Sequence, residues 1–170
     1  MTHNDVVTTS MTLRLAEPAE FGAAGEVTEA AYRADGVLGH DDYAETLRNA
    51  ADRAKRAELI VAVDGGKVLG TVTFCPPGSP YRELAHDDSE GEFRMLAVAP
   101  SARRQGVARA LVECCLDRSR ALGQTSMVLC SAASMSGAHA LYASMGFTRV
   151  PELDWCPVPS VELLGFHLAL

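Results

Sequence analysis

The spacing of apolar residues changes along the chain between a period of two, which is typical of strands, and a period near 3.6, which is typical of helices. Residues 11–16 alternate, whereas the apolar residues from Phe21 to Ala31 recur at helical spacing. Two short apolar runs flank Gly65 and Gly66, which predicts a hairpin. The expected strands are 11–16, 59–63, 68–74, 93–98, 127–130, 147–153 and 161–170, and the expected helices are 18–31, 41–54, 106–122 and 138–145.

The order of these elements, β-α-α-β-β-β-α-β-α-β-β, determines the expected fold class. Strand–helix–strand units allow parallel pairing, whereas hairpins pair their strands antiparallel. We therefore predict an α/β chain in which helices flank a mixed sheet. No repeat or linker divides the sequence, so residues 11–170 are expected to form one domain that follows a flexible segment at 1–10. Met1 and Met11 both remain candidates for the natural start.

Composition and charge exclude several classes of protein. The 170 residues, of which 48% are hydrophobic and 22% charged, are typical of one globular domain and not of a disordered chain. No apolar run approaches the roughly 20 residues of a membrane span, and the first residues lack a signal-peptide pattern. We expect a cytoplasmic protein with no membrane partner. The net charge of −7 argues against nucleic acid as a partner, and the five cysteines lack the CxxC spacing of a metal site.

The loop from Arg103 to Ala108 carries the most specific chemical signal. It follows a predicted strand that ends at Pro100, and it opens a long amphipathic helix. The free amides of a helix N-terminus suit a phosphate group, small residues at Gly106 and Ala108 allow close approach, and the two arginines add donors. The loop lacks the Gly-Lys-Ser/Thr ending of a P-loop and the GxGxxG of a Rossmann loop. A solvated arginine pair is the alternative interpretation.

This loop resembles the acyl-CoA loop of the GNAT-type N-acetyltransferase superfamily. The family pattern Gln/Arg-x-x-Gly-x-Gly/Ala stands here as Arg103-Arg104-Gln105-Gly106-Val107-Ala108. A second segment, from Ala138 to Phe147, looks like the family's helix that ends in Leu-Tyr-x-x-x-Gly-Phe, and the order of elements matches from Met11 to Leu170. The resemblance implies the GNAT-like acyl-CoA N-acyltransferase fold, with a mostly antiparallel sheet and two splayed parallel strands at the CoA site.

The resemblance also assigns the residues that would bind acetyl-CoA. The pantetheine arm would pair with the strand backbone at Leu96, Ala97 and Val98, and the pyrophosphate would lie on the amides of the turn from Arg104 to Ala108. Many relatives carry an asparagine where this chain has Met135, which removes one polar contact to the pantetheine.

Tyr142 is the candidate catalytic acid. When an amine attacks a thioester, the leaving group is a thiolate with a reference pKa of about 8.5, and a tyrosine with a pKa of about 10 still holds a proton to donate. Periodicity alone favours a core aromatic, because Tyr142 lies on the apolar stripe of its helix. The match to Leu-Tyr-x-x-x-Gly-Phe favours the catalytic interpretation.

Glu92 is the candidate general base by resemblance, because many relatives carry a glutamate at this place on the strand. An alkylammonium with a pKa of about 10.4 must lose a proton before it attacks. Glu90 lies two residues earlier on the same side of the strand, and water is a third candidate. A solvated carboxylate near a strand end is an equally good interpretation of Glu92.

The resemblance therefore implies an enzyme that moves an acetyl group from acetyl-CoA to a primary amine by direct attack, with no covalent enzyme intermediate and no metal. A non-catalytic acyl-CoA sensor, or an acyltransferase with another acyl group or acceptor, is the alternative. The acceptor would be a small-molecule or peptide amine bound by residues 32–43 and 76–88. A homodimer through the closing strands remains open.

Overall fold

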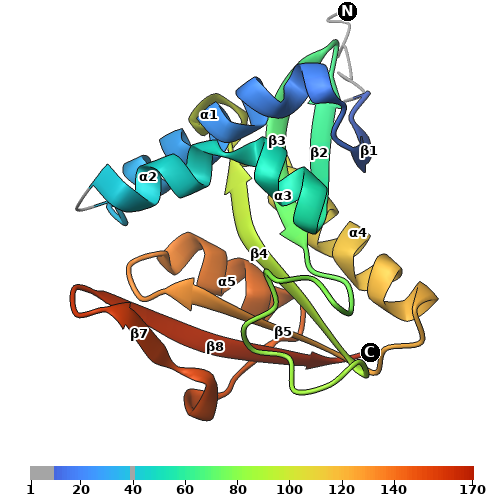
Figure 1. Cartoon of the computed structure of the whole chain (residues 1–170), viewed down its shortest axis with the longest axis vertical. Helices are drawn as coiled ribbons and strands as arrows, with labels where there is room; N and C mark the ends of the chain where they lie inside the picture. The colour runs from blue at the N-terminus through green and yellow to red at the C-terminus, as the bar shows by residue number, and fades with distance from the viewer. Residues whose placement is uncertain (1–9, 39–40) are drawn as a thin grey trace, which may run out of the picture.

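The computed structural model describes residues 10–38 and 41–170, so the segment expected to be flexible lies, except for Ser10, outside the described residues. The described residues form eight strands, five α-helices and three short 3₁₀ turns (Figure 1). The strands are β1 (Thr12–Leu15), β2 (Glu58–Asp64), β3 (Lys67–Phe74), β4 (Glu90–Val98), β5 (Ser126–Ala132), β6 (Thr148–Arg149), β7 (Trp155–Val158) and β8 (Val161–Ala169). The helices are α1 (Phe21–Ala34), α2 (Asp41–Arg48), α3 (Ala50–Arg56), α4 (Val107–Ala121) and α5 (Ser136–Ser144).

All the strands belong to one mixed sheet. Its order is β1-β2-β3-β4-β5-β8-β6, and β7 pairs with another part of β8. The β4–β5 pair is parallel, and the other pairs are antiparallel. A mixed, mostly antiparallel sheet covered by helices is therefore confirmed.

Alternation along the strands divides the core into two layers. Leu59 and Val61 of β2 pack in a cluster with Ala24 of α1 and Ala50 of α3. Ile60, between them, points to the opposite face and packs in the larger cluster that includes residues of α4. The N-terminal helices and α4 therefore cover opposite faces of the sheet, which period-two alternation requires.

The parallel strands β4 and β5 pair over only a short distance and then diverge (Figure 1). Their register ends at Glu92 opposite Val128, whereas β4 continues to pair with β3 as far as Val98. A bulge occurs in β4 just beyond this point, where Met95 has a φ of +55°. Because a bulge bends its strand and increases the local twist, it turns β4 away from β5 and opens a gap in the sheet.

Two elements differ from the sequence predictions. The expected helix at 41–54 is divided at Asn49, whose side chain accepts a hydrogen bond from the backbone of Asp52 at 3.1 Å and caps α3. The expected strand at 147–153 is reduced to β6 and is followed by a 3₁₀ turn that begins at Pro151. Strand β7 was not among the expected strands, because Pro157 lies within it and proline usually interrupts a strand, although an edge strand tolerates proline.

Among the helices in residues 10–38 and 41–170, none is both long enough and apolar enough to cross a membrane.

Candidate active site

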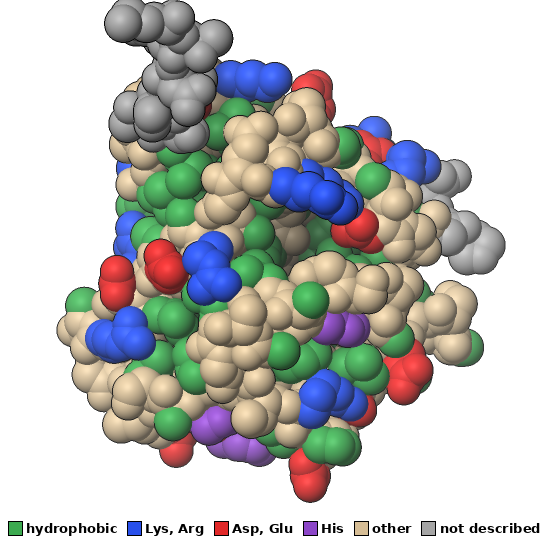
Figure 2. Space-filling view, turned by 180° about the vertical axis from the view of Figure 1, so that it is seen from behind, with side chains coloured by type: hydrophobic (Ala, Val, Ile, Leu, Met, Phe, Trp, Pro, Cys, Tyr) green, Lys and Arg blue, Asp and Glu red, His purple; other side chains and the backbone are tan. Residues whose placement is uncertain are grey.

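A cavity of about 650 Å³ lies where β4 and β5 diverge. Its walls come from the α1–α2 region, β4, the end of β5, α5 and the β7–β8 hairpin. The lining is mostly apolar and contains five aromatic side chains, those of Tyr32, Tyr43, Phe93, Tyr142 and Trp155. On the face seen in Figure 2, hydrophobic side chains lie in a hollow between two parts of the molecule, with basic side chains beside it. An apolar cavity with few polar groups is the usual form of a small-molecule site.

Helix α5 places Tyr142 in the wall of this cavity. The side chain is 3% exposed, and its ring packs against Phe93, Phe147 and Phe166 with centroid distances of 6.2, 5.6 and 5.5 Å. Burial raises the pKa of the Tyr142 hydroxyl above its ordinary value. The group therefore remains protonated at neutral pH. No hydrogen bond joins this hydroxyl to another of the described residues, so its proton is available to a bound molecule.

Beyond the bulge, β4 has a backbone edge that β5 does not pair. The amide of Ala99 donates to the carbonyl of Leu69 at 2.8 Å, and Ala97 lies opposite Thr71 on β3. Because successive peptide groups of a strand point to opposite sides, those of Leu96 and Val98 are directed into the gap. Three residues were expected to pair with pantetheine. The N–H and C=O of Ala97 face β3 within the sheet, whereas those of Leu96 and Val98 face the gap.

The turn from Arg103 to Ala108 forms the N-terminus of α4, beyond the carboxyl end of β4. Arg104 and Gly106 both have left-handed backbone, with φ of +63° and +78°. The first bond within the helix runs from the amide of Ala110 to the carbonyl of Gly106, so the amides before Ala110 are free. A Cβ added at Gly106 would meet no atom within 4 Å, so the space above this turn is open.

The polar side chains of this turn lie at the surface. The Nη1 of Arg103 is 3.2 Å from Oδ1 of Asp35, just after α1, and Gln105 donates to the carbonyl of Ser101 at 3.5 Å. Arg104 is exposed, and Val107 is buried at 1% exposure and anchors the turn to the core. Arg103 uses one nitrogen for Asp35 and keeps its other donors, and the free amides of the turn are already in place.

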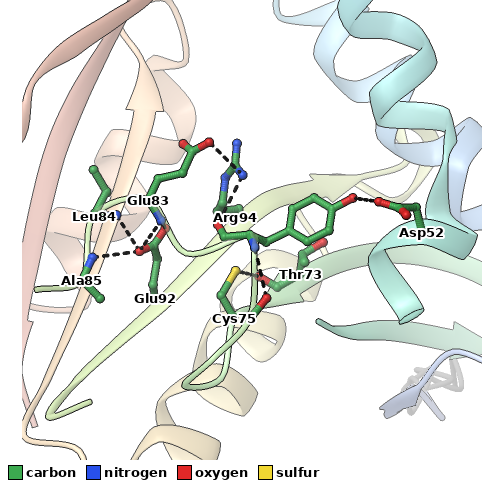
Figure 3. Close-up of polar contacts among 10 residues, drawn as sticks. Asp52, Thr73, Cys75, Glu83, Leu84, Ala85, Glu92 and Arg94 are labelled. Carbon is green, nitrogen blue, oxygen red and sulfur yellow. Dashed lines mark hydrogen bonds and ion pairs between the residues drawn. The ribbon is translucent and has the colours of Figure 1, made fainter. Parts of the chain in front are cut away.

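Glu92 does not line the cavity, although it lies on β4 beside it. The side chain is 0% exposed, and its carboxylate accepts hydrogen bonds from the amides of Glu83, Leu84 and Ala85 (Figure 3). Glu90 is engaged in the same way, with an oxygen 2.7 Å from the amide of His86. Both carboxylates therefore hold the loop that covers this side of β4.

Sequence reasoning missed the two charged residues of the cavity wall, Glu83 and Arg94. The Nη1 of Arg94 lies 3.3 Å from Oε1 of Glu83 (Figure 3) and 3.3 Å from the carbonyl oxygen of Tyr81. A charge between Phe93 and Met95 in an apolar strand was a signal for Arg94. Nothing in the polar loop distinguished Glu83 from its neighbours.

The described residues do not form a recognisable metal-binding site. In the part of the chain that the structure describes, no group of three or more His, Cys, Asp or Glu side chains is arranged to hold an ion. The five cysteines are free.

Comparison with known families supports the resemblance stated above. A family model described as "Acetyltransferase (GNAT) family" matches residues 26–147. N-acetyltransferase 8 of Rattus norvegicus is 34% identical over 136 residues, which cover 75% of this chain and 56% of that protein. N-acetylaspartate synthetase of Danio rerio is 31% identical over 101 residues, 59% of this chain and 33% of that protein. The chain spans about half the length of N-acetyltransferase 8 and 8B, which are curated relatives that it matches.

Solved structures share the fold at low identity. The Salmonella typhimurium protein yncA, solved with its cofactor acetyl-CoA, has a TM-score of 0.68 at 22% identity and covers 94% of each chain. A GNAT-family acetyltransferase of Staphylococcus aureus Mu50 has a TM-score of 0.74 at 12% identity, covering 95% of this chain and 99% of that one. The fold expected from the sequence is thus confirmed, and the chain belongs to the acetyltransferase (GNAT) family.

Proposed function

We propose that this chain transfers an acetyl group from acetyl-CoA to a primary amine. The observation that carries the proposal is the position of Tyr142, a buried and protonated hydroxyl in the wall of the cavity between β4 and β5. A protein that only sensed acyl-CoA would not need a proton donor there. The named relatives are N-acetyltransferases, and yncA holds acetyl-CoA in the same fold.

The residues around the gap fit acetyl-CoA as the acyl donor. The peptide groups of Leu96 and Val98 would pair with the pantetheine amides, and Ala97 would hold this edge against β3. The free amides from Arg104 to Ala108 and the positive end of the α4 dipole would bind the pyrophosphate. Gly106 leaves that approach open, because no side chain covers the turn.

The proposed reaction is a direct transfer. The neutral amine nitrogen attacks the thioester carbonyl and forms the C–N bond, and its extra proton passes to water. The C–S bond then breaks, Tyr142 donates its proton to the departing thiolate, and water returns a proton to Tyr142. Cys130, which lines the cavity, is a poor nucleophile, because burial raises the pKa of its thiol. Most of the rate gain would come from holding amine and thioester together.

The proposal is tested by incubating the chain with acetyl-CoA and a panel of amines, aminoglycosides and peptides while free thiol is followed. Release of thiol that depends on an amine, with one N-acetyl product per thiol, supports the proposal. Tight binding of acetyl-CoA without turnover across the panel would favour the sensor. Faster turnover with propionyl-CoA or succinyl-CoA than with acetyl-CoA would show that the enzyme transfers a different acyl group.

Gly106→Glu should weaken acetyl-CoA binding at least tenfold, about 1.4 kcal/mol. The new carboxylate would occupy the open space above the free amides and repel the pyrophosphate. Gly78→Glu is the matched control, since Gly78 also has a left-handed φ of +83° and open space around its Cβ position. The two variants therefore share the backbone strain. Equal affinities in a calorimetric titration of both folded variants would rule out the turn as the phosphate site.

A further inference from the structure

The cavity wall contains one ion pair among side chains that are otherwise uncharged and mostly apolar. Among the described residues that line it, Glu83 and Arg94 are the charged ones, and their side chains are 34% and 19% exposed. Such a pair adds little to stability, because desolvation opposes the attraction between the charges. The stability of the fold therefore does not explain why Glu83 is present in the cavity wall.

Arg94 has partners that remain if Glu83 turns to a ligand. Its guanidinium donates to the carbonyl of Tyr81 and lies 5.9 Å from the centre of the Tyr81 ring. The contact with Glu83 uses Oε1 alone, and no hydrogen bond or ion pair joins Oε2 to another residue of the described part of the chain. Glu83 can thus accept a further hydrogen bond without leaving Arg94 unpaired.

Glu92 fixes the backbone from which Glu83 projects. Its buried carboxylate accepts from the amide of Glu83 at 3.0 Å, from that of Leu84 at 2.8 Å and from that of Ala85 at 2.9 Å. A buried carboxylate is stable only when such donors surround it, so the three amides cannot leave it without a large cost. Figure 3 shows the result, with the carboxylate of Glu92 bonded to the amides of Leu84 and Ala85 and the side chain of Glu83 extending to Arg94.

A second contact holds the same loop from the other side. The hydroxyl of Tyr81 donates to Asp52 of α3 at 2.5 Å (Figure 3), so the loop is tied to α3 as well as to β4. The backbone of Glu83 is therefore held at a defined place beside the cavity, as the support of a group that orients a ligand must be.

We propose that Glu83 binds the amino group of the acceptor, that Glu92 is its positioning residue, and that the acceptor is a primary amine on an aromatic or aliphatic body. This inference rests on the proposed function. The carboxylate of Glu83 accepts an N–H hydrogen bond and directs the nitrogen lone pair at the thioester, and the proton lost from nitrogen passes to water. The rings of Tyr32, Tyr43 and Trp155 enclose the rest of the molecule.

The test compares 2-phenylethylamine and hexylamine with putrescine and ethanolamine as acceptors. The wild type should use the two apolar amines with a kcat/KM at least tenfold higher. Glu83→Gln keeps the size of the side chain and removes its charge, so it should raise KM for 2-phenylethylamine at least tenfold with unchanged affinity for acetyl-CoA. An unchanged KM in this variant, or a preference for the polar amines, would overturn the inference.

A double-mutant cycle tests the role of Glu92. If Glu92 acts through Glu83, Glu92→Gln should raise KM, and the double variant Glu83→Gln/Glu92→Gln should resemble Glu83→Gln alone. Additive effects on KM would overturn the positioning role. Glu152→Gln is the matched control, because Glu152 is exposed and does not line the cavity. If Glu92→Gln does not fold, the KM of Glu83→Gln still decides the acceptor site.

These outcomes separate the inference from the function on which it rests. Turnover of polar amines with acetyl-CoA would leave the acetyltransferase proposal intact and overturn the acceptor class. A wild type that neither binds acetyl-CoA nor acetylates any of the four amines would overturn both.

Discussion

Replacing Tyr142 with phenylalanine should lower kcat by on the order of a hundredfold or more. The change removes one hydroxyl and keeps the ring that packs among Phe93, Phe147 and Phe166. The loss should appear in kcat, because the proton is needed only when the C–S bond breaks. The affinity for acetyl-CoA should change little, since the peptide groups of β4 and the amides of α4 are untouched.

Stability measurements distinguish this role from a packing role. Tyr142→Phe should melt close to the wild type, whereas Tyr142→Leu removes the ring itself and should lower the melting temperature as well as kcat. If Tyr142→Phe instead loses stability and keeps its kcat, Tyr142 is the core aromatic that periodicity alone favours.

Arg53→Ala should lower the free energy of unfolding by about 3 kcal/mol. Arg53 is 0% exposed, and its guanidinium donates to the carbonyls of Leu47 at 2.6 Å and Thr46 at 3.2 Å, and to the hydroxyl of Thr28 at 3.1 Å. It thus joins α3 to the end of α2 and to α1. Alanine would leave buried acceptors without donors and a cavity where the side chain was.

Urea denaturation measures this change, and Arg56→Ala is the matched control. Arg56 lies in the same helix, but its side chain is 56% exposed and pairs with Asp52 at the surface. Its loss should change the free energy of unfolding by less than about 1 kcal/mol. Equal effects of the two substitutions would contradict the role given to Arg53.

The sequence predicts those parts of the fold that depend on local patterns. Residues 59–74 are recognisable because two apolar runs flank Gly65 and Gly66, and α4 because its amphipathic stretch begins at Gly106 and ends before Gly123. Strand β7 is hard to predict because it contains Pro157, and proline is incompatible with a central strand but not with an edge strand. The division between α2 and α3 begins at Asn49, which is a common N-cap residue, but it also depends on the buried Arg53, whose contact with Thr28 of α1 forms only in the folded chain.

In the candidate site, too, features set by a local sequence pattern can be predicted, whereas contacts between distant segments cannot. The turn from Arg103 to Ala108 and the helix of Tyr142 carry contiguous motifs, so both can be proposed from the sequence. The direction of Glu92 depends on the loop that folds over β4, and the contact between Glu83 and Arg94 joins residues on different elements. The bulge at Met95, which opens the gap, has no local signal, because methionine rarely adopts a positive φ.

The central claim is that acetyl-CoA lies in the gap between β4 and β5 with its pyrophosphate on the first turn of α4. Amide hydrogen exchange, measured with and without saturating acetyl-CoA, tests it without knowledge of the acceptor. The account predicts slower exchange at Leu96, Val98 and the amides from Gly106 to Ala108, and no change in the β1–β2 pair at the edge of the sheet. Bound acetyl-CoA that leaves exchange at these amides unchanged would contradict it.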